Sequence, residues 1–212
     1  MIEFSHVSKA YEQETVFEDF SFRAEQGEFV LITGKSGSGK TTLIRMLLLE
    51  EKPDRGNIYV QERDILKIPR EKIPFYRRKI GVIFQDFKLI GEQTVKENIA
   101  MAMLVAGMGV NDTKIHHVAK LLGILDLLKK YPREISGGQQ QKVGLARAII
   151  NDPLILVADE PTANLDPGYS RIMKELFELI HHQGTTLFVA THDPILEESK
   201  GAKVLSLDTV RS

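Results

Sequence analysis

The sequence FVLITGKSGSGKTTLIRMLLLE, residues 29–50, decides the fold class of this chain. It opens with an apolar run, passes through a glycine-rich loop at residues 34–41, and continues into a pattern typical of a helix. Gly34, Gly37 and Gly39 allow backbone amides to turn inward around an anion without clashes from a Cβ atom. The flanking strand and helix favour a phosphate-binding loop over the alternative, a glycine-rich turn with a surface lysine.

The side chains of this loop predict a site for a nucleoside triphosphate. Lys40 would reach the β- and γ-phosphates, and the hydroxyl of Thr41 would bind Mg²⁺. The positive end of the following helix would strengthen the attraction for phosphate. The residues expected to contact the nucleotide are Gly34, Ser36, Gly37, Ser38, Gly39, Lys40, Thr41 and Thr42.

Outside the loop, strand patterns alternate with helical patterns, which is typical of βαβ units. Continuously apolar runs suit parallel strands covered on both faces, and these runs are residues 29–33, 80–84, 154–158 and 186–190. Runs of alternating character suit half-exposed strands, and these are residues 2–7, 16–23 and 57–60. The chain is therefore predicted to have an α/β fold with a parallel-sheet core.

The strand signal disappears between about residues 92 and 150. Residues 94–97 (TVKE) form a capping box that predicts the start of a helix. Further helices are expected from Asp112 to about Leu122 and from near Gly137. We interpret this segment, about 92–150, as a helical subdomain inserted into a single domain 1–212 whose core is about 1–91 and 151–212.

Composition excludes several classes of protein. The 212 residues are 42% hydrophobic and 27% charged, which is ordinary for a globular chain with a real core. Lysine plus arginine number 28 against 29 acids, so net charge gives no reason to expect nucleic-acid binding. Cysteine is absent, which excludes disulfides and thiolate chemistry. The N-terminal residues do not read as a secretory signal, and the apolar run 99–110 is too short to span a bilayer.

Two carboxylates close one of the apolar strands, in LILVADEP at residues 154–161. At the carboxyl end of a parallel strand, where ligands of α/β sheets collect, both side chains can reach one site. We expect Asp159 to hold Mg²⁺ directly or through water, and Glu160 to act as general base toward the attacking water. The alternative, a solvated turn, is less favoured in a chain that also has a phosphate loop.

The segment ISGGQQQKVGLARAI, residues 135–149, predicts a second helix start of unusual composition. Ser136 and Gln139 fit a capping box, and a well-capped helix is the simplest interpretation. Gly137 and Gly138 argue for more, because each glycine costs about 1 kcal/mol in a helix relative to alanine. Exposed amides, a hydroxyl and a helix dipole would make a second phosphate site, most simply one that meets a nucleotide bound by another subunit.

Together these motifs resemble those of ABC-type ATPases in order and spacing. The shared elements are GKSGSGKT, Gln85, ISGGQ, LILVADEP, ANLD and His192, and they cover nearly the whole chain. Ile135 stands where the family usually has leucine. The resemblance implies an ABC ATPase fold, which adds an antiparallel β subdomain to the parallel core, and hydrolysis of ATP with Mg²⁺.

The resemblance also implies roles for single residues. Tyr11 would stack on adenine, although an ordinary aromatic beside a strand would look the same. Gln85 would touch Mg²⁺ and the attacking water, and His192 would hydrogen-bond the γ-phosphate. Of the remaining histidines, all are expected to be mostly solvated: His6, His116, His117, His181 and His182.

In ABC-type ATPases two subunits close head to tail around two ATP molecules. The resemblance therefore implies that this chain forms an ATP-dependent homodimer. Asn164, Leu165 and Asp166 would bridge the two sites as a D-loop. The residues expected to meet the nucleotide bound by the partner are Ser136, Gly137, Gly138 and Gln139, together with Asp166.

Within the family, the segments IPFYRRKIGVIFQDFKLI, TVKENIA and DEPTANLD most resemble the ATPases of bacterial cell division. That branch implies an integral membrane partner, control of peptidoglycan hydrolases, and a location on the cytoplasmic face of the plasma membrane. ATPases of lipoprotein release and macrolide export share much of this pattern and remain an alternative. An ATP-binding scaffold with little turnover is an alternative of another class.

Residues 85–90 (QDFKLI) are the expected docking point of the membrane partner, together with the helical insertion. Phe87 and Leu89 are candidate anchors, helped by Met101 and Met103, because methionine adapts to irregular partners. The alternative is that these side chains pack beneath the helical insertion. The basic run at residues 77–79 would approach anionic lipid or form an ordinary charged turn.

Overall fold

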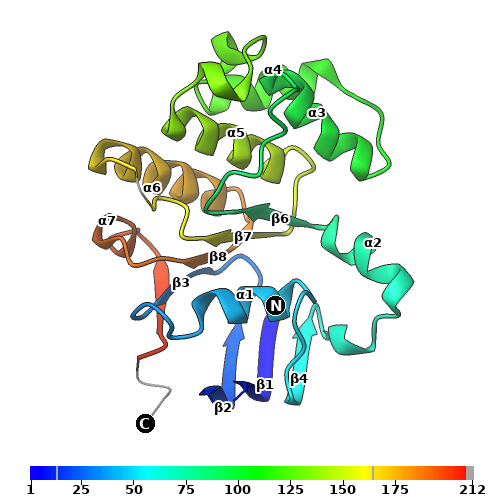
Figure 1. The fold of residues 1–212 in the computed structure, drawn as a ribbon, viewed down its shortest axis with the longest axis vertical. Helices are drawn as coiled ribbons and strands as arrows, with labels where there is room; N and C mark the ends of the chain where they lie inside the picture. The colour runs from blue at the N-terminus through cyan, green and yellow to red at the C-terminus, as the bar shows by residue number, and fades with distance from the viewer. Residues whose placement is uncertain (13, 164, 209–212) are drawn as a thin grey trace.

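The computed structural model describes residues 1–12, 14–163 and 165–208. Its centre is a five-stranded sheet in the order β6-β7-β8-β3-β9, in which every neighbouring pair is parallel. The strands are β3 (Phe29–Thr33), β6 (Ile80–Ile83), β7 (Ile155–Asp159), β8 (Thr186–Ala190) and β9 (Ala202–Ser206). Because the strands are parallel, their carboxyl ends lie along one edge, where the loops after β3, β6, β7 and β8 meet (Figure 1).

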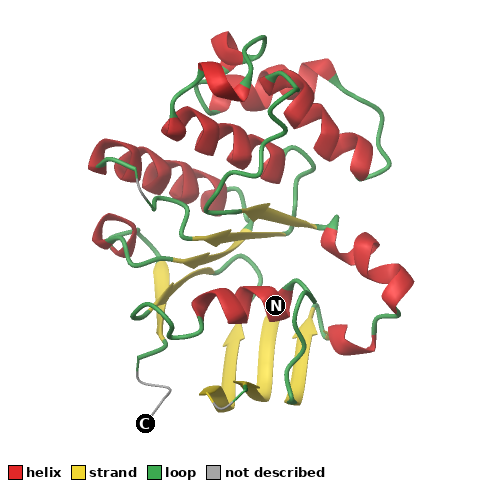
Figure 2. Cartoon of the chain, in the orientation of Figure 1, coloured by secondary structure: helices red, strands yellow, loops and turns green. Residues whose placement is uncertain are grey.

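A second sheet is antiparallel and has the order β2-β1-β4-β5. Its strands are β1 (Ile2–Tyr11), β2 (Glu14–Ala24), β4 (Arg55–Val60) and β5 (Arg63–Asp64). Helix α1 (Lys40–Leu47) lies between this sheet and the parallel sheet (Figure 2). The expected combination of a parallel core with an antiparallel β subdomain is confirmed.

The remaining helices lie above the parallel sheet and at its sides in Figure 1. They are α2 (Ile73–Arg77), α3 (Val95–Val105), α4 (Asp112–Leu121), α5 (Gly137–Ile149), α6 (Pro167–His182) and α7 (Pro194–Glu197). Single 3₁₀ turns occur at Ile65–Lys67, Arg70–Lys72, Leu125–Leu127 and Pro132–Glu134. The described part of residues 92–150 contains helices and turns and no strand, as its sequence predicted.

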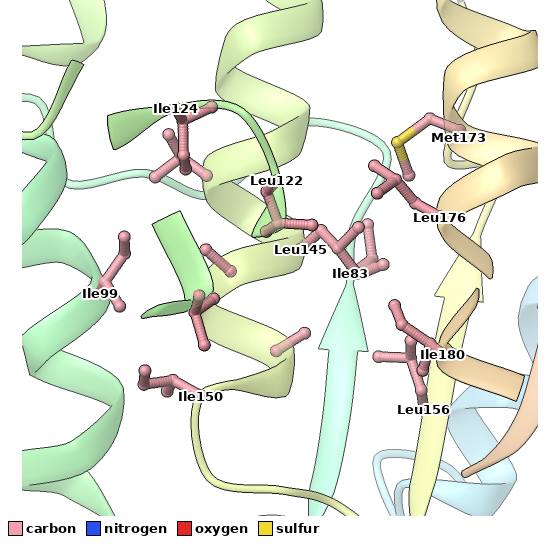
Figure 3. Close-up of a cluster of buried hydrophobic side chains, with 14 of the residues drawn as sticks. Ile83, Ile99, Leu122, Ile124, Leu145, Ile150, Leu156, Met173, Leu176 and Ile180 are labelled. Atoms are coloured by element: carbon pink, nitrogen blue, oxygen red, sulfur yellow. The ribbon is translucent and has the colours of Figure 1, made fainter. Parts of the chain in front are cut away.

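The parallel sheet separates two hydrophobic cores, and the alternation of side chains along a strand decides which core each residue joins. Phe29 and Leu31 pack with α3, α4, α5 and α6, whereas Val30 and Ile32 pack with α1 and the antiparallel sheet. Figure 3 shows part of the first core, where β6, β7, α5 and α6 bring their apolar side chains together. Burial of both faces explains why these strands read as unbroken apolar runs.

Several elements differ from their sequence-based expectation. Strand β1 continues to Tyr11, beyond the predicted end at residue 7, because a pairing with β2 persists to the end of the hairpin. Strand β9 was not predicted, because as an edge strand it keeps two exposed residues, Lys203 and Val204. Helix α2 was missed because it is short and has no fully buried residue to produce a periodic pattern.

Among the described residues, no helix is both long enough and apolar enough to cross a membrane.

Candidate nucleotide site

The glycine-rich loop lies between the end of β3 and the start of α1, as its sequence predicted. Gly34, Gly37 and Gly39 have φ values of 144°, 78° and 103°, a region that residues with a Cβ rarely adopt. At Gly39 a Cβ would also lie 2.6 Å from Cγ1 of Val16 and 2.7 Å from Cζ of Phe17. The loop therefore requires glycine at residue 39 for both its backbone angle and its contact with β2.

Lys40 turns back over this loop. Its Nζ atom donates to the carbonyl oxygens of Gly34 at 2.7 Å and Lys35 at 3.3 Å. The same Nζ lies 3.5 Å from Oε1 of Glu160, and the lysine side chain is only 8% exposed. The ammonium group thus lies between the phosphate loop and the carboxylate after β7, where it can meet the terminal phosphates of a nucleotide.

Thr41 and Asp159 meet across this edge of the sheet. The Thr41 hydroxyl donates to Oδ1 of Asp159 at 3.2 Å. Burial raises the pKa of Asp159 above its ordinary value, the hydrogen bond from Thr41 lowers it, and the nearby charge of Glu160 raises it again. A hydroxyl and a half-buried carboxylate are the hard oxygen donors that Mg²⁺ prefers.

The rest of the donor set also fits Mg²⁺. The described residues contain no cluster of three or more His, Cys, Asp or Glu side chains that would hold a metal by themselves. Magnesium in nucleotide enzymes usually binds one or two protein oxygens and completes its shell with phosphate and water. Thr41 and Asp159 supply this small number of ligands next to the phosphate loop, and Gln85 lines a hollow of the surface together with both of them.

Glu160 leaves the strand in a left-handed conformation, with φ of 46°. Its amide donates to the carbonyl of Ala190 at 2.9 Å, which ties the turn to the end of β8. Strict strand alternation would send Asp159 and Glu160 to opposite faces. The turn at Glu160 ends this alternation and brings both carboxylates to one site.

Glu160 is held by His192, which follows β8. Nδ1 of His192 lies 2.8 Å from Oε2 of Glu160, and the His192 amide donates to the same oxygen at 3.3 Å. The carboxylate side chain is 15% exposed, whereas the histidine ring is 71% exposed. Glu160 thus has one oxygen directed to His192 and the other toward Lys40, so the orientation of its carboxylate is held from both sides.

Whereas Asp159 lines a neighbouring hollow, most of these groups line one hollow of about 620 Å³, which is a suitable size for a nucleotide. Its walls include the whole of residues 34–42 together with Tyr11, Gln85, Glu160 and His192. The Tyr11 ring is 38% exposed at the mouth, with Nζ of Lys9 4.9 Å from the ring centroid. A second hollow of about 940 Å³ adjoins it and is lined by Thr41, Gln85, Asp159 and Gly137.

The signature segment, residues 135–139 (ISGGQ), lies at the start of α5. Ser136 and Gln139 form the predicted capping box: the Gln139 amide donates to Oγ of Ser136 at 3.3 Å, and the Ser136 amide donates to Oε1 of Gln139 at 2.9 Å. Gly137 lines the larger hollow. None of residues 136–139 lines the hollow that contains the phosphate loop, and of these four only Gly137 shares the larger hollow with Thr41 and Asp159.

The structure explains the need for glycine at residue 138 in a way that the sequence did not suggest. A Cβ at this position would lie 2.0 Å from Cε1 of Tyr169, in the first turn of α6. Within one chain, the close contact of the Tyr169 ring therefore requires glycine at residue 138. Tyr169 escaped the sequence analysis because nothing in the pattern PGYS marks it as part of a site.

The D-loop lies directly before α6. Asn164 is outside the described residues. Asp166 caps α6, since its Oδ1 accepts from the amides of Gly168 at 2.9 Å and Tyr169 at 3.3 Å. Leu165 is half-buried and lines the larger hollow.

Residues 85–90 form a braced loop after β6. Phe87 and Lys88 have positive φ values of 57° and 47°. Arg147 of α5 donates to the carbonyl of Lys88 at 2.6 Å and to that of Phe87 at 3.3 Å. Burial lowers the pKa of Arg147 below its ordinary value. The sequence analysis missed this arginine because a single basic residue on a helix normally faces solvent.

A second brace comes from Asn98 of α3, which is fully buried. Its Oδ1 accepts from the Ile90 amide at 2.8 Å, and its Nδ2 donates to the Ile90 carbonyl at 3.0 Å. Both braces come from the helical insertion, so side-chain hydrogen bonds tie the loop that follows β6 to that insertion. This arrangement suits a segment that links the nucleotide site to another part of the molecule.

Two expectations about side chains were wrong. Met103, expected as an anchor for a partner, is 3% exposed and belongs to the first core. His181, expected to be mostly solvated, has Nε2 2.9 Å from the Gly27 carbonyl and packs on Phe29, with ring centroids 5.7 Å apart. Both lie on the inner faces of helices whose amphipathic pattern was not followed residue by residue. Phe87 and Leu89 are half-buried.

Comparison with known proteins decides the family. The ABC transporter family profile matches residues 17–163. The chain belongs to the ABC transporter ATPase family. It binds and hydrolyses ATP, and the expected ABC ATPase fold is confirmed.

Relatives of this ABC ATPase extend over nearly its full length. Cell division ATP-binding protein FtsE of Escherichia coli strain K12 is 40% identical over 210 residues, which cover 98% of this chain and 95% of the relative. FtsE of Streptococcus pneumoniae strain D39 is 41% identical over 214 residues, with 100% and 93% covered. FtsE of Bacillus subtilis strain 168 is 40% identical over 211 residues, with 98% and 92% covered.

Solved structures agree with the fold. The ATP-binding cassette MJ0796, solved as a dimer in a post-hydrolysis state with ADP and Pi, superimposes with a TM-score of 0.85 at 29% identity. That comparison covers 97% of this chain and 94% of the other. A second dimeric structure of MJ0796 gives the same TM-score at 30% identity, with 98% and 95% covered.

Proposed function

We propose that this ABC ATPase acts in bacterial cell division, where ATP hydrolysis drives a separate, FtsX-like membrane protein that controls peptidoglycan hydrolases. The observation that carries this proposal is the 40% identity to FtsE over 98% of the chain. The protein would work on the cytoplasmic face of the plasma membrane, held there by its partner.

In the proposed mechanism, the amides of residues 34–39 and the ammonium group of Lys40 hold the phosphates. Thr41, Asp159 and Gln85 would hold Mg²⁺, whose charge would stabilise the negative charge that develops on the phosphates during transfer. Tyr11 would pack against the adenine.

Glu160 would take the proton of the water that attacks the γ-phosphate. Two observations support this role: Oε1 lies beside Lys40 at 3.5 Å, and Oε2 is held by His192 at 2.8 Å. His192 would keep the carboxylate aligned and donate to the γ-phosphate when the ring turns toward it. Gln85, which lines the same hollow, would help to position this water.

The second half of each site would come from another copy of the chain. Ser136, Gly137, Gly138 and Gln139 start a helix whose first turn has a hydroxyl and backbone amides suited to phosphate. Because these residues lie away from the hollow of their own phosphate loop, they would complete the site of a head-to-tail partner, with Asp166 of the D-loop between the two sites. The dimeric structures solved for MJ0796 support assembly of two copies.

The membrane partner would dock at residues 85–90 and the adjoining part of α3. Ile90 of this loop is an exposed apolar residue, and so are Leu104 and Val105 at the end of α3 and Met108 beyond it. Since Arg147 and Asn98 brace the loop while Gln85 lines the nucleotide hollow, movement of a docked partner would be felt at the γ-phosphate.

Depletion of the protein in its own bacterium tests the cellular role. The proposal predicts filaments or chains of unseparated cells with reduced wall-hydrolase activity. Normal separation combined with failed lipoprotein sorting or failed macrolide export would instead assign the chain to one of those transport systems.

A further inference from the structure

Tyr169 links two segments that the proposed function places at the interface between subunits. Its hydroxyl lies 3.3 Å from Oγ of Ser136 in the signature segment. Its ring covers Gly138, where a Cβ would lie 2.0 Å from Cε1 and 2.3 Å from Cζ. Its backbone amide donates to Oδ1 of Asp166 in the D-loop at 3.3 Å.

The D-loop reaches the signature segment at a second point as well. A Cβ built on Gly137 would lie 3.6 Å from Cδ2 of Leu165, an ordinary contact distance. The start of α5 and the start of α6 are thus packed together, and the hydroxyl of Tyr169 joins them by a polar side-chain contact with Ser136.

We propose that Tyr169 is a positioning residue for ATP hydrolysis, which holds the Ser136 hydroxyl and the first turn of α5 in the orientation that receives the γ-phosphate of the partner subunit's nucleotide. This inference rests on the proposed role of the signature segment. Tyr169 itself does not line the hollow of the phosphate loop and acts through Ser136.

The hydrogen-bonding capacity of a hydroxyl explains how the tyrosine acts. A serine oxygen accepts two hydrogen bonds and donates one. The Gln139 amide already donates to Oγ of Ser136 at 3.3 Å. When the Tyr169 hydroxyl donates to the remaining lone pair, both acceptor positions are filled, and the serine proton is left to point outward toward a phosphate oxygen. Without the phenol hydroxyl, the proton of Ser136 can take other orientations. The fraction of molecules in which it points toward the phosphate is then smaller.

The first experiment replaces Tyr169 by Phe, which keeps the ring over Gly138 and removes only the hydroxyl. The expected result is a kcat about fivefold lower, the effect of about one net hydrogen bond, with KM for ATP within about twofold of the starting value. ATP binding by the phosphate loop of the monomer should not change, because Tyr169 does not line that hollow. The matched control is Tyr59→Phe on β4, which should keep full activity.

A purely structural role for Tyr169 would give a different result. In that case Tyr169→Phe would lower the thermal midpoint and leave kcat at the wild-type value at temperatures where the protein is folded. Unchanged kcat overturns the proposal, and so does an equal loss in the Tyr59→Phe control.

A double-mutant cycle separates this inference from the proposed function. Ser136→Ala should lose far more activity than Tyr169→Phe, and the double variant should be no slower than Ser136→Ala alone, because the phenol then has no hydroxyl to orient. Full activity of Ser136→Ala would refute the second phosphate site and the role of Tyr169 with it. If Ser136→Ala is impaired and the Tyr169 effect is simply additive, the second site stands and only the role of Tyr169 is wrong.

Discussion

Glu160 shows how one backbone angle assembles the site. Its φ of 46° is uncommon for a residue with a side chain, and it occurs where a buried strand ends beside the phosphate loop. Positive φ values outside glycine often mark functional positions, because the surrounding structure must compensate for the strain. At Glu160 the compensation comes from hydrogen bonds to Ala190 and His192. This turn brings the carboxylate to the face where Asp159 and Lys40 lie.

Asp159 gives the first prediction, because burial raises the pKa of its carboxyl. The folded chain then binds this proton more readily than the unfolded chain does. The contribution of the group to stability is therefore greatest at low pH and is lost as the pH rises through the folded pKa. Asp159→Asn removes the charge and keeps an oxygen that accepts from Thr41.

We expect Asp159→Asn to raise the thermal midpoint of the nucleotide-free protein at pH 8 by no more than about 2–4 °C, because the partly exposed group is screened by solvent. The difference should shrink as the pH falls and vanish below the ordinary pKa of an aspartate, about 3.9. Magnesium-dependent hydrolysis should fall sharply in the same variant. Thermal scans over this pH range measure the effect, and a lower midpoint at pH 8 would show that the charge stabilises the fold.

At the scale of elements, the chain has two helices that start in the same way and have different proposed tasks. Helix α3 begins with a capping box of Thr94 and Glu97, and α5 begins with one of Ser136 and Gln139. Both hydroxyls accept from the third helical amide at 3.3 Å. The hydrogen bonds that cap the two helices are therefore alike, so a substitution in one cap is a control for the same substitution in the other.

Thr94→Ala and Ser136→Ala should each lower the free energy of unfolding by about 1 kcal/mol, the usual cost of losing a helix cap. Only Ser136→Ala should also lose ATP hydrolysis, because only its helix is proposed to face a phosphate. Denaturant titration and a steady-state ATPase assay measure both quantities. An equal loss of hydrolysis in the two variants would mean that the Ser136 hydroxyl serves only as a cap.

A further prediction concerns Phe87, in the loop after β6. Phe87→Glu should weaken co-purification with the membrane partner while ATP binding is retained, because the half-buried ring lies at the proposed docking surface. Leu179→Glu is the matched control, since Leu179 is 39% exposed on α6, away from residues 85–90. Misfolding of Phe87→Glu would instead show that Phe87 packs beneath the helical insertion.

At the scale of the whole molecule, much of the fold could be predicted from the sequence because both of its strongest signals are local. The phosphate loop needs glycine at set positions, and parallel strands buried on both faces read as apolar runs. The edge strand β9 and the short helix α2 give no such pattern. Likewise Arg147, Asn98 and Tyr169 act through contacts between segments distant in sequence, which no spacing reveals.

The arrangement of the molecule also suggests how hydrolysis depends on a second copy of the chain. Within one chain, Lys40, Glu160 and His192 line one hollow, and the signature segment lies outside it. Under the proposed function, the site is completed when two copies meet, so that hydrolysis and separation of the dimer would be linked. A variant that binds ATP without hydrolysing it should then remain dimeric.

Glu160→Gln tests this claim most directly, because it keeps the size of the side chain and removes the base. We expect the variant to bind ATP as tightly as the wild type, to lose turnover by at least about 10²-fold, and to elute with ATP as a nucleotide-bound dimer in size-exclusion chromatography with light scattering. Hydrolysis at the wild-type rate, or a monomer that retains ATP, would contradict the account.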